Sequence, residues 1–192
     1  MALSHAILVA LLDCSSSGYE LSKRFDGSVG FFWDASHQQI YRELAKLEAA
    51  GSIAAKTIEQ SARPNKKLYS ITPQGQTQLA KWLHASSAMA PIKDDLLVKL
   101  FGGYLVEPDV ILQELRQHRK LHQTRLVEYQ AIEERFFPDV EALSQKSTYQ
   151  YLTLRNGIQY EQGWLKWCDE ALLTLQALPK VPTDAIADEC SV

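Results

Sequence analysis

The sequence predicts a mainly helical chain that contains one short β-hairpin. Three observations lead to this fold class. Apolar residues recur at helical spacing through most of the 192 residues. β-prone residues are concentrated in two short runs, residues 53–58 and 67–71. A turn-rich connector, residues 61–66, separates these runs. We therefore expect a small β-wing inserted among helices.

The helix before the hairpin is predicted from its ends and its periodicity. Ser36 and Gln39 have capping-box spacing, and Gly51 stands where a helix needs a left-handed residue. At 3.6 residues per turn, one face of this helix is apolar and should be buried; it consists of Ile40, Leu44 and Leu47.

The opposite face of this helix is polar and carries little acid, with small alanines between Arg and Gln side chains. Small residues allow close approach to a DNA major groove, and Arg and Gln can read base edges. For the helix taken alone, an ordinary solvated face is the alternative. The segments on either side favour the DNA-binding interpretation.

Those segments give the order of a winged helix-turn-helix. An apolar run, residues 6–12, and a turn followed by a helix, residues 17–25, precede the predicted recognition helix. The hairpin then follows, and Thr72 and Pro73 have the residue types that begin another helix. The hairpin tip is expected to gather Arg63, Lys66 and Lys67 as a group of cations for backbone phosphates.

These considerations give a set of candidate DNA-binding residues. They are Tyr19, Ser36, His37, Gln38, Gln39, Tyr41, Arg42, Lys46, Arg63, Lys66 and Lys67.

Charge is distributed unequally between the two halves of the chain. Residues 1–85 hold nine Lys/Arg against seven Asp/Glu, whereas residues 86–192 hold eleven against sixteen. We expect a DNA-binding domain at 1–85, a linker at 86–94, an α-helical dimerisation domain at 95–178 and a flexible tail at 179–192. With so small a basic excess, DNA affinity should be modest and strongly salt-dependent.

The second half is predicted to contain helices at 95–105, 108–137 and 147–178. Its last helix should bury Leu152, Tyr160, Gly163, Trp164, Trp167, Ala171 and Leu175. Two helices this long leave a groove that a second copy would fill, although a small autonomous bundle is the alternative. The candidate dimerisation residues are Leu115, His122, Leu126, Tyr129, Ile132, Tyr160, Trp164 and Trp167.

Other chemistries find little support. His118 and His122 have the spacing of a helical metal pair, but Arg119 and Lys120 lie between them, so interface or surface histidines are expected and no metal site. Nucleophile-elbow, P-loop and dinucleotide motifs are absent from the sequence, which predicts no enzyme activity and no cofactor. Three widely spaced cysteines and no apolar run of membrane-spanning length predict a cytoplasmic protein that does not enter a membrane.

Several segments resemble the PadR family of bacterial transcriptional regulators. Residues 17–21, 29–33, 36–41 and 67–72 are similar to its N-terminal domain, and residues 154–161 with Trp164 and Trp167 to the C-terminal helical domain of its longer members. Arg42 departs from the family pattern, since many relatives have proline after the tyrosine. The resemblance implies a homodimer that binds operator DNA and usually represses transcription.

The resemblance also implies a small aromatic effector such as a phenolic acid. Aromatic residues suggest a pocket for it, and the candidates are Phe32, Trp33, Tyr104 and Trp164. Two alternatives remain open at this point: a winged protein-interaction module, and a ligand sensor that does not bind DNA directly.

Overall fold

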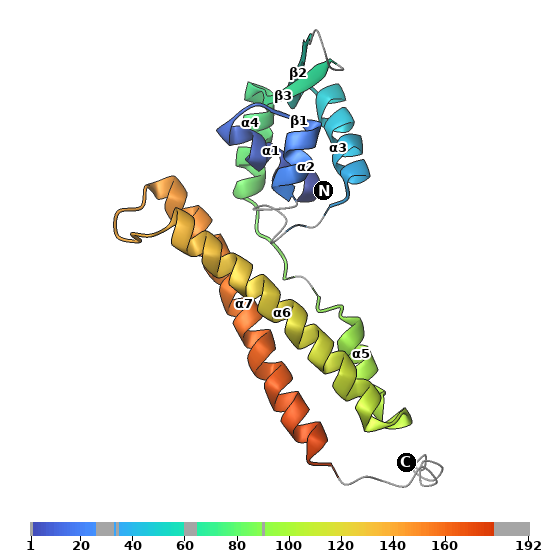
Figure 1. Ribbon diagram of the computed structural model, residues 1–192. Coiled ribbons are helices and arrows are strands. Elements are labelled where there is room, and N and C mark those ends of the chain that lie inside the picture. Colours follow the sequence, from blue (N-terminus) through green and yellow to red (C-terminus); the bar gives the residue numbers. More distant parts are fainter. Residues whose placement is uncertain (1, 26–32, 34, 60–64, 90, 179–192) are drawn as a thin grey trace. The chain divides into compact units, whose positions relative to one another are not determined.

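The computed structural model describes residues 2–25, 33, 35–59, 65–89 and 91–178. The chain divides into two compact units, Met1–Met89 and Ala90–Val192, called unit 1 and unit 2 below. Figure 1 labels the elements of both units, and each unit is described by itself.

Unit 1 contains helices packed around a small sheet. In chain order its described elements are α1 (Ala2–Asp13), β1 (Ser16–Ser17), α2 (Gly18–Phe25), α3 (His37–Ala49), β2 (Ile53–Ile58), β3 (Lys66–Ile71) and α4 (Pro73–Leu83). This order confirms the predicted sequence of helix, helix, recognition helix, hairpin and helix.

Both ends of α3 form as predicted. The Ser36 hydroxyl accepts a hydrogen bond from the Gln39 backbone N–H, and the Gln39 side chain accepts one from the Ser36 backbone N–H. This reciprocal pair satisfies two amides that the first helical turn leaves free. Gly51 follows the helix with a φ of 71°, a left-handed conformation that favours glycine.

The sheet is antiparallel, with strand order β1-β3-β2. β2 pairs with β3 from Ile53 opposite Ile71 to Ile58 opposite Lys66. β2 has the predicted bounds, whereas β3 begins one residue earlier than predicted, at Lys66. The two-residue strand β1 was not predicted, and its Ser16 pairs with Tyr69.

The core of unit 1 lies where α1 contacts α3, α4 and β3. Ile7 and Leu8 of α1 are fully buried, as are Ile40 and Leu44 of α3. Full burial of one such side chain is worth about 1.5–3 kcal/mol. The predicted buried face of α3 is therefore confirmed.

The start of α4 lies directly on the turn between α3 and β2. A Cβ atom on Gly75 would be 2.0 Å from the backbone oxygen of Ser52, so only glycine fits there. The Thr72 hydroxyl accepts a hydrogen bond from the Gly75 N–H and caps the helix, as predicted. This contact joins α4 to the base of the wing.

Unit 2 is built on two long helices. Its described elements are α5 (Asp95–Phe101), the 3₁₀ turn η1 (Gly103–Leu105), α6 (Pro108–Phe136) and α7 (Gln145–Gln176). The predicted helix 95–105 is thus divided at Gly102. α7 begins two residues before its predicted start, because Ser144 caps it by accepting a hydrogen bond from the Ser147 N–H.

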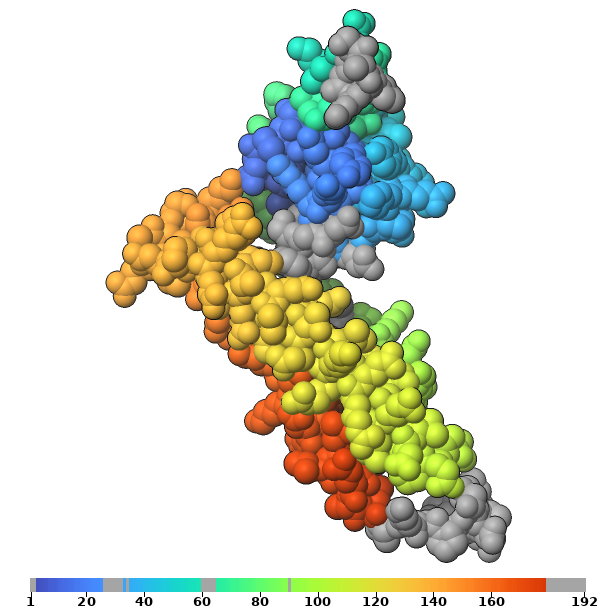
Figure 2. Space-filling model, viewed as in Figure 1, coloured from blue at the N-terminus to red at the C-terminus, as the bar shows by residue number. Residues whose placement is uncertain are grey.

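Helices α6 and α7 run antiparallel and lie side by side (Figures 1 and 2). Arg119 pairs with Asp169 near one end of the hairpin, and Glu133 pairs with Arg155 near the other. Among the described residues, no helix combines the length and the apolar character needed to cross a bilayer.

The predicted inner face of α7 is only partly correct. Trp164, Trp167, Ala171 and Leu175 pack against buried Leu96, Ile111 and Leu115. Leu152 and Tyr160, however, are 58% and 57% exposed. The residues of α7 that are buried instead are Leu154, Ile158, Glu161 and Cys168. Gly163 has no atom within 4 Å of the position of a Cβ.

A hydrogen-bonded pair, His122 and Glu161, joins the middle of the two long helices. Glu161 is only 2% exposed, and its carboxylate lies 2.5 Å from Nδ1 of His122. The His122 ring stacks on Trp164, with ring centroids 4.7 Å apart. His122 is therefore partly buried within the hairpin and is not a freely exposed surface histidine, while its predicted place at a dimer interface stays a prediction.

We predict that His122→Phe destabilises unit 2 by about 1–3 kcal/mol, because it keeps a ring against Trp164 but leaves the buried Glu161 side chain without its hydrogen-bond partner. Arg119→Ala is the matched control, since its pair with Asp169 is exposed and should contribute less than about 1 kcal/mol. Urea unfolding at fixed protein concentration measures both. Equal losses in the two variants would contradict a special role for the buried pair.

Candidate nucleic-acid interface

The contact between α2 and α3 centres on a glycine. A Cβ atom on Gly18 would lie 2.5 Å from Cε1 of Tyr41, so the tyrosine ring occupies the space that any other side chain at position 18 would take. Tyr41 is nonetheless half exposed. Its ring covers Gly18 at the start of α2, while part of its surface remains available.

The polar face of α3 is exposed, as predicted. The exposed residues on it are His37, Gln38, Gln39, Tyr41, Arg42, Ala45, Lys46 and Ala49, and Ser36 before the helix is also exposed. Two of the candidate readers, Ser36 and Gln39, already bond each other, because Oε1 of Gln39 accepts from the Ser36 N–H at 2.9 Å and from its hydroxyl at 3.1 Å. Their first role is to start the helix.

Arg42 differs from Lys46, the lysine of the same helix. Lys46 bonds Glu43 at 3.1 Å within α3 itself. Arg42 is exposed and has no acidic partner in the described part of unit 1. Its guanidinium is therefore open to an external acceptor.

The wing lysines are arranged differently from the prediction. Lys66 Nζ lies 2.7 Å from Glu20 of α2, and Lys67 Nζ lies 2.7 Å from Glu48 of α3. Successive residues of a strand point to opposite faces, so the two lysines cannot gather at one tip. The prediction of one cationic group was wrong for this pair, and Arg63 lies outside the described residues.

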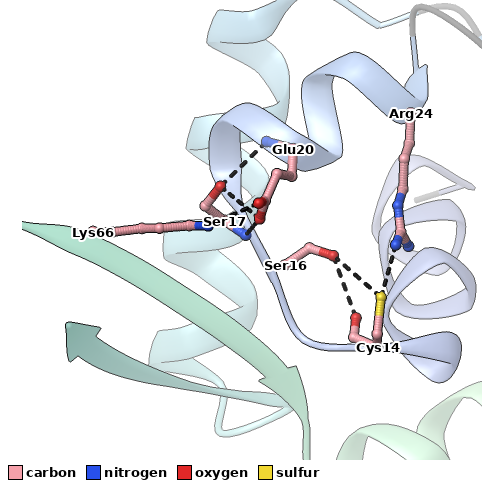
Figure 3. A network of polar contacts seen from close by, with 6 residues as sticks. All are labelled: Cys14, Ser16, Ser17, Glu20, Arg24 and Lys66. Atoms are coloured by element: carbon pink, nitrogen blue, oxygen red, sulfur yellow. Dashed lines mark hydrogen bonds and ion pairs between the residues drawn. The ribbon is translucent and has the colours of Figure 1, made fainter.

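The start of α2 has a second capping box, which was not predicted. The Glu20 carboxylate accepts from the Ser17 N–H at 2.8 Å and from its hydroxyl at 2.9 Å, and the Ser17 hydroxyl accepts from the Glu20 N–H (Figure 3). The Ser-x-x-Glu spacing in the sequence could have revealed it. Tyr19, between them, is exposed and has Lys23 Nζ over its ring.

The Arg24 side chain of α2 contacts the end of α1 and the residue that follows it, Cys14. Arg24 donates from Nη1 to the backbone oxygen of Ala10 at 2.9 Å. It also donates from Nη2 to Sγ of Cys14 at 2.7 Å (Figure 3). The guanidinium lowers the pKa of the Cys14 thiol. Arg24 thus ties α1 to α2 and is committed to the fold.

Glu20 has a strongly lowered pKa, about 2 against an ordinary value of 4.5. The hydrogen bond from Lys66 is the main cause, followed by the bonds from the Ser17 backbone and hydroxyl. A carboxylate with a lowered pKa stabilises the folded state fully above pH 4.5, and this stabilisation is lost as the pH falls towards 2.

We predict that Glu20→Gln lowers the free energy of unfolding by up to about 1 kcal/mol at pH 7, because the amide keeps the cap but loses the exposed ion pair. The difference from the unchanged protein should shrink as the pH falls from 4.5 towards 2, where Glu20 becomes neutral. Urea unfolding at several pH values checks this. A difference that stayed constant down to the lowest pH would count against it.

The candidate effector residues are divided between the two units. Phe32 lies outside the described residues, and Trp33 is exposed in unit 1. In unit 2, Tyr104 is exposed, while Trp164 is packed between His122 and Trp167. A ligand pocket formed by these residues stays a prediction. Within the described residues, no group of three or more His, Cys, Asp or Glu side chains is placed to hold a metal ion.

Three of the eight candidate dimerisation residues lie inside the protomer. Leu115, Leu126 and Tyr129 are buried between the helices of unit 2, and a Cβ on Gly157 would lie 2.9 Å from the Tyr129 ring. These side chains have almost no surface left for a second copy. Ile132, Trp164 and Trp167 are partly buried, and Tyr160 is the exposed member of the set.

Two family descriptions match the chain. The transcriptional regulator PadR-like family matches residues 7–81, and the virulence activator alpha C-terminal region matches residues 92–176. A probable transcriptional regulator of Mycobacterium tuberculosis is 39% identical over 188 residues, which cover 92% of this chain and 98% of that protein.

Solved structures show the same similarity. The negative transcriptional regulator PadR of Bacillus subtilis, 28% identical over 173 residues that cover 88% of this chain and 95% of that protein, has a structure in complex with operator DNA. That structure has a TM-score of 0.80 at 26% identity and covers 91% of this chain and 99% of its own. Its complex with p-coumaric acid has a TM-score of 0.74 at 25% identity, covering 92% and 99%. The Vibrio cholerae virulence activator AphA has a TM-score of 0.75 at 30% identity, covering 92% and 99%.

These similarities confirm the predicted fold class, a winged helix-turn-helix followed by a helical domain, and the predicted resemblance. They also agree with the prediction that the chain is not an enzyme, since the family is one of DNA-binding regulators. With a relative 39% identical along nearly the whole of both chains, the protein belongs to the PadR-like family of transcriptional regulators.

Proposed function

We propose that this regulator binds operator DNA as a homodimer, places α3 in the major groove and represses transcription in the cytoplasm. The observation that carries the proposal is the exposed face of α3, where Arg42 is open to an external acceptor and Ala45 and Ala49 leave room for a groove wall. An arginine fork can contact O6 and N7 of guanine together. The operator complex of the Bacillus subtilis relative supports this placement.

The proposed function is tested by fluorescence-anisotropy titration of the DNA upstream of the protein's own gene, with random DNA as control. Arg42→Ala should weaken binding to the upstream DNA by about 1–3 kcal/mol and change binding to random DNA little, because it removes a base contact. An equal loss on both DNAs would make Arg42 a phosphate contact. If the unchanged, folded protein binds neither DNA at low salt, it acts instead as an interaction module or ligand sensor.

The dimer is proposed from exposed apolar side chains at the start of unit 2. Val98, Phe101 and Tyr104 are 72%, 90% and 73% exposed, and Leu105 beside them is also exposed. We call these four residues the α5 patch. Exposed apolar groups that lie close together mark surfaces that another molecule covers. A second copy suits this regulator, because winged-helix dimers read paired half-sites about one helical turn apart.

We predict that Phe101→Ser weakens dimerisation by about 2 kcal/mol or more, as expected for an aromatic residue at the centre of an interface. Sedimentation equilibrium measures the effect. Leu83→Ser, which removes an exposed apolar side chain from unit 1, should leave the association constant unchanged. A monomeric unchanged protein at micromolar concentration, or equal association of both variants, would exclude the α5 patch as the dimer contact.

A small aromatic effector completes the proposal. The complex of the Bacillus subtilis relative with p-coumaric acid supports a phenolic acid as the ligand class. Adding phenolic acids to the same anisotropy titration should release the DNA. Unchanged affinity across a panel of them would leave regulation without a phenolic effector.

A further inference from the structure

Carboxylates from the two helices of the helix-turn-helix hold two of the lysines of the wing, Lys66 and Lys67. Glu20 of α2 reaches Lys66, as Figure 3 shows, and Glu48 of α3 reaches Lys67, each at 2.7 Å. The two contacts join residues 46 and 19 positions apart in the chain, so they are features of the fold and not of one helix.

Helix stability does not explain the position of Glu48. It lies in the last turn of α3, where the helix dipole disfavours an acidic side chain and favours a basic one. Lys67 compensates this charge, and the carboxylate in turn raises the pKa of Lys67. The pair therefore contributes to the charge of the surface that surrounds α3.

The same arrangement limits the number of cations that DNA meets. In the described part of α3 and the wing, Lys46, Lys66 and Lys67 each have an acidic partner, whereas Arg42 and Lys56 have none. A phosphate that binds Lys66 or Lys67 must displace a carboxylate or share the lysine with it. The freed carboxylate then lies close to the phosphate and repels it.

We propose that Glu20 and Glu48 are internal competitors of the DNA backbone, which occupy the wing lysines in the free protein and so limit the affinity for DNA of any sequence. The inference rests on the proposed function, because it assumes that unit 1 binds DNA. It adds that the acids of unit 1, together with its lysines, set the strength and the salt dependence of that binding.

The salt dependence gives the competition a measurable form. A lysine that neutralises a phosphate releases counterions from DNA, which contributes about 0.9 to the slope of log affinity against log salt. In this protein the displaced carboxylate attracts cations at the same step, which would offset part of that contribution. Removing the carboxylate should restore the full contribution of the lysine.

Glu48→Gln is the first variant, because Glu20 also caps α2. Its affinity for upstream and random DNA should rise by a similar factor, up to about fivefold, the equivalent of one exposed ion pair of about 1 kcal/mol. The salt slope should steepen by up to about 0.9. Thermal melting should show no loss of stability, because the variant removes an acid from the end of a helix.

A double-mutant cycle separates a local competition from a general change in charge. In a Lys67→Gln background, Glu48→Gln should no longer raise the affinity. Glu59→Gln is the matched control. It removes the same charge beside the wing, from an exposed residue with no lysine partner among the described residues. Any rise in DNA affinity that it causes should be the same with and without Lys67→Gln.

The outcomes distinguish the inference from the proposed function. Loss of the Glu48→Gln effect in the Lys67→Gln background supports the competition. An effect equal to that of Glu59→Gln in both backgrounds, or no effect at all in a protein that binds DNA, overturns it. A folded protein that binds no DNA overturns the proposed function, and the inference with it.

Discussion

The short segment at Ser17 and Gly18, where α2 begins, is the place on which unit 1 depends. A side chain at position 18 would displace the half-exposed ring of Tyr41 that covers it from α3. The same few residues also start α2 through the Ser17–Glu20 capping box, pair β1 with β3 and receive Lys66 from the wing. Helix α2, the sheet and the wing lysine Lys66 are therefore joined at one place, and a change there affects all three together.

The number of cations that unit 1 can offer to DNA depends on which of them are paired with carboxylates, and not on its total charge. A basic excess of two predicts weak attraction for DNA, but the contacts divide the cations into those held by carboxylates and those open to an external acceptor. Arg42 belongs to the second group and lies on the exposed face of α3. Under the proposed function, Arg42, which has no acidic partner, contacts the DNA bases. Lys66 and Lys67 of the wing bind phosphates only in competition with Glu20 and Glu48.

Sequence reasoning succeeded where the determinants are local. The caps at Ser36 and Thr72 and the left-handed Gly51 depend on residues within four positions, and all three were predicted correctly. It failed where the determinants are distant in the chain. β1 exists only because β3 pairs with it, and the acidic partners of Lys66 and Lys67 come from separate helices. The Ser17–Glu20 cap is an exception, since its spacing is visible in the sequence.

The first half of α7 shows a different cause of error. Its buried stripe passes through Leu154, Ile158 and Glu161, and a charged residue in the stripe conceals its apolar period. For this reason Tyr160 and Leu152, which are exposed, were predicted to be buried in its place. Glu161 can be buried because His122 of α6 lies beside it and bonds its carboxylate, and this partner is 39 residues away in the chain.

The limited affinity of one unit 1 gives the proposed dimer a physical role. With few uncommitted cations, a single winged domain gains little from backbone phosphates, and most non-specific affinity comes from such contacts. Two domains joined through unit 2 bind the second half-site at a high effective concentration, so the pair binds much more tightly than either domain alone. That gain depends on the spacing of the two domains. An effector that altered the spacing would therefore release DNA without touching α3. If Glu20 and Glu48 compete with DNA as proposed, the weaker single domains would make the regulator more dependent on correct spacing.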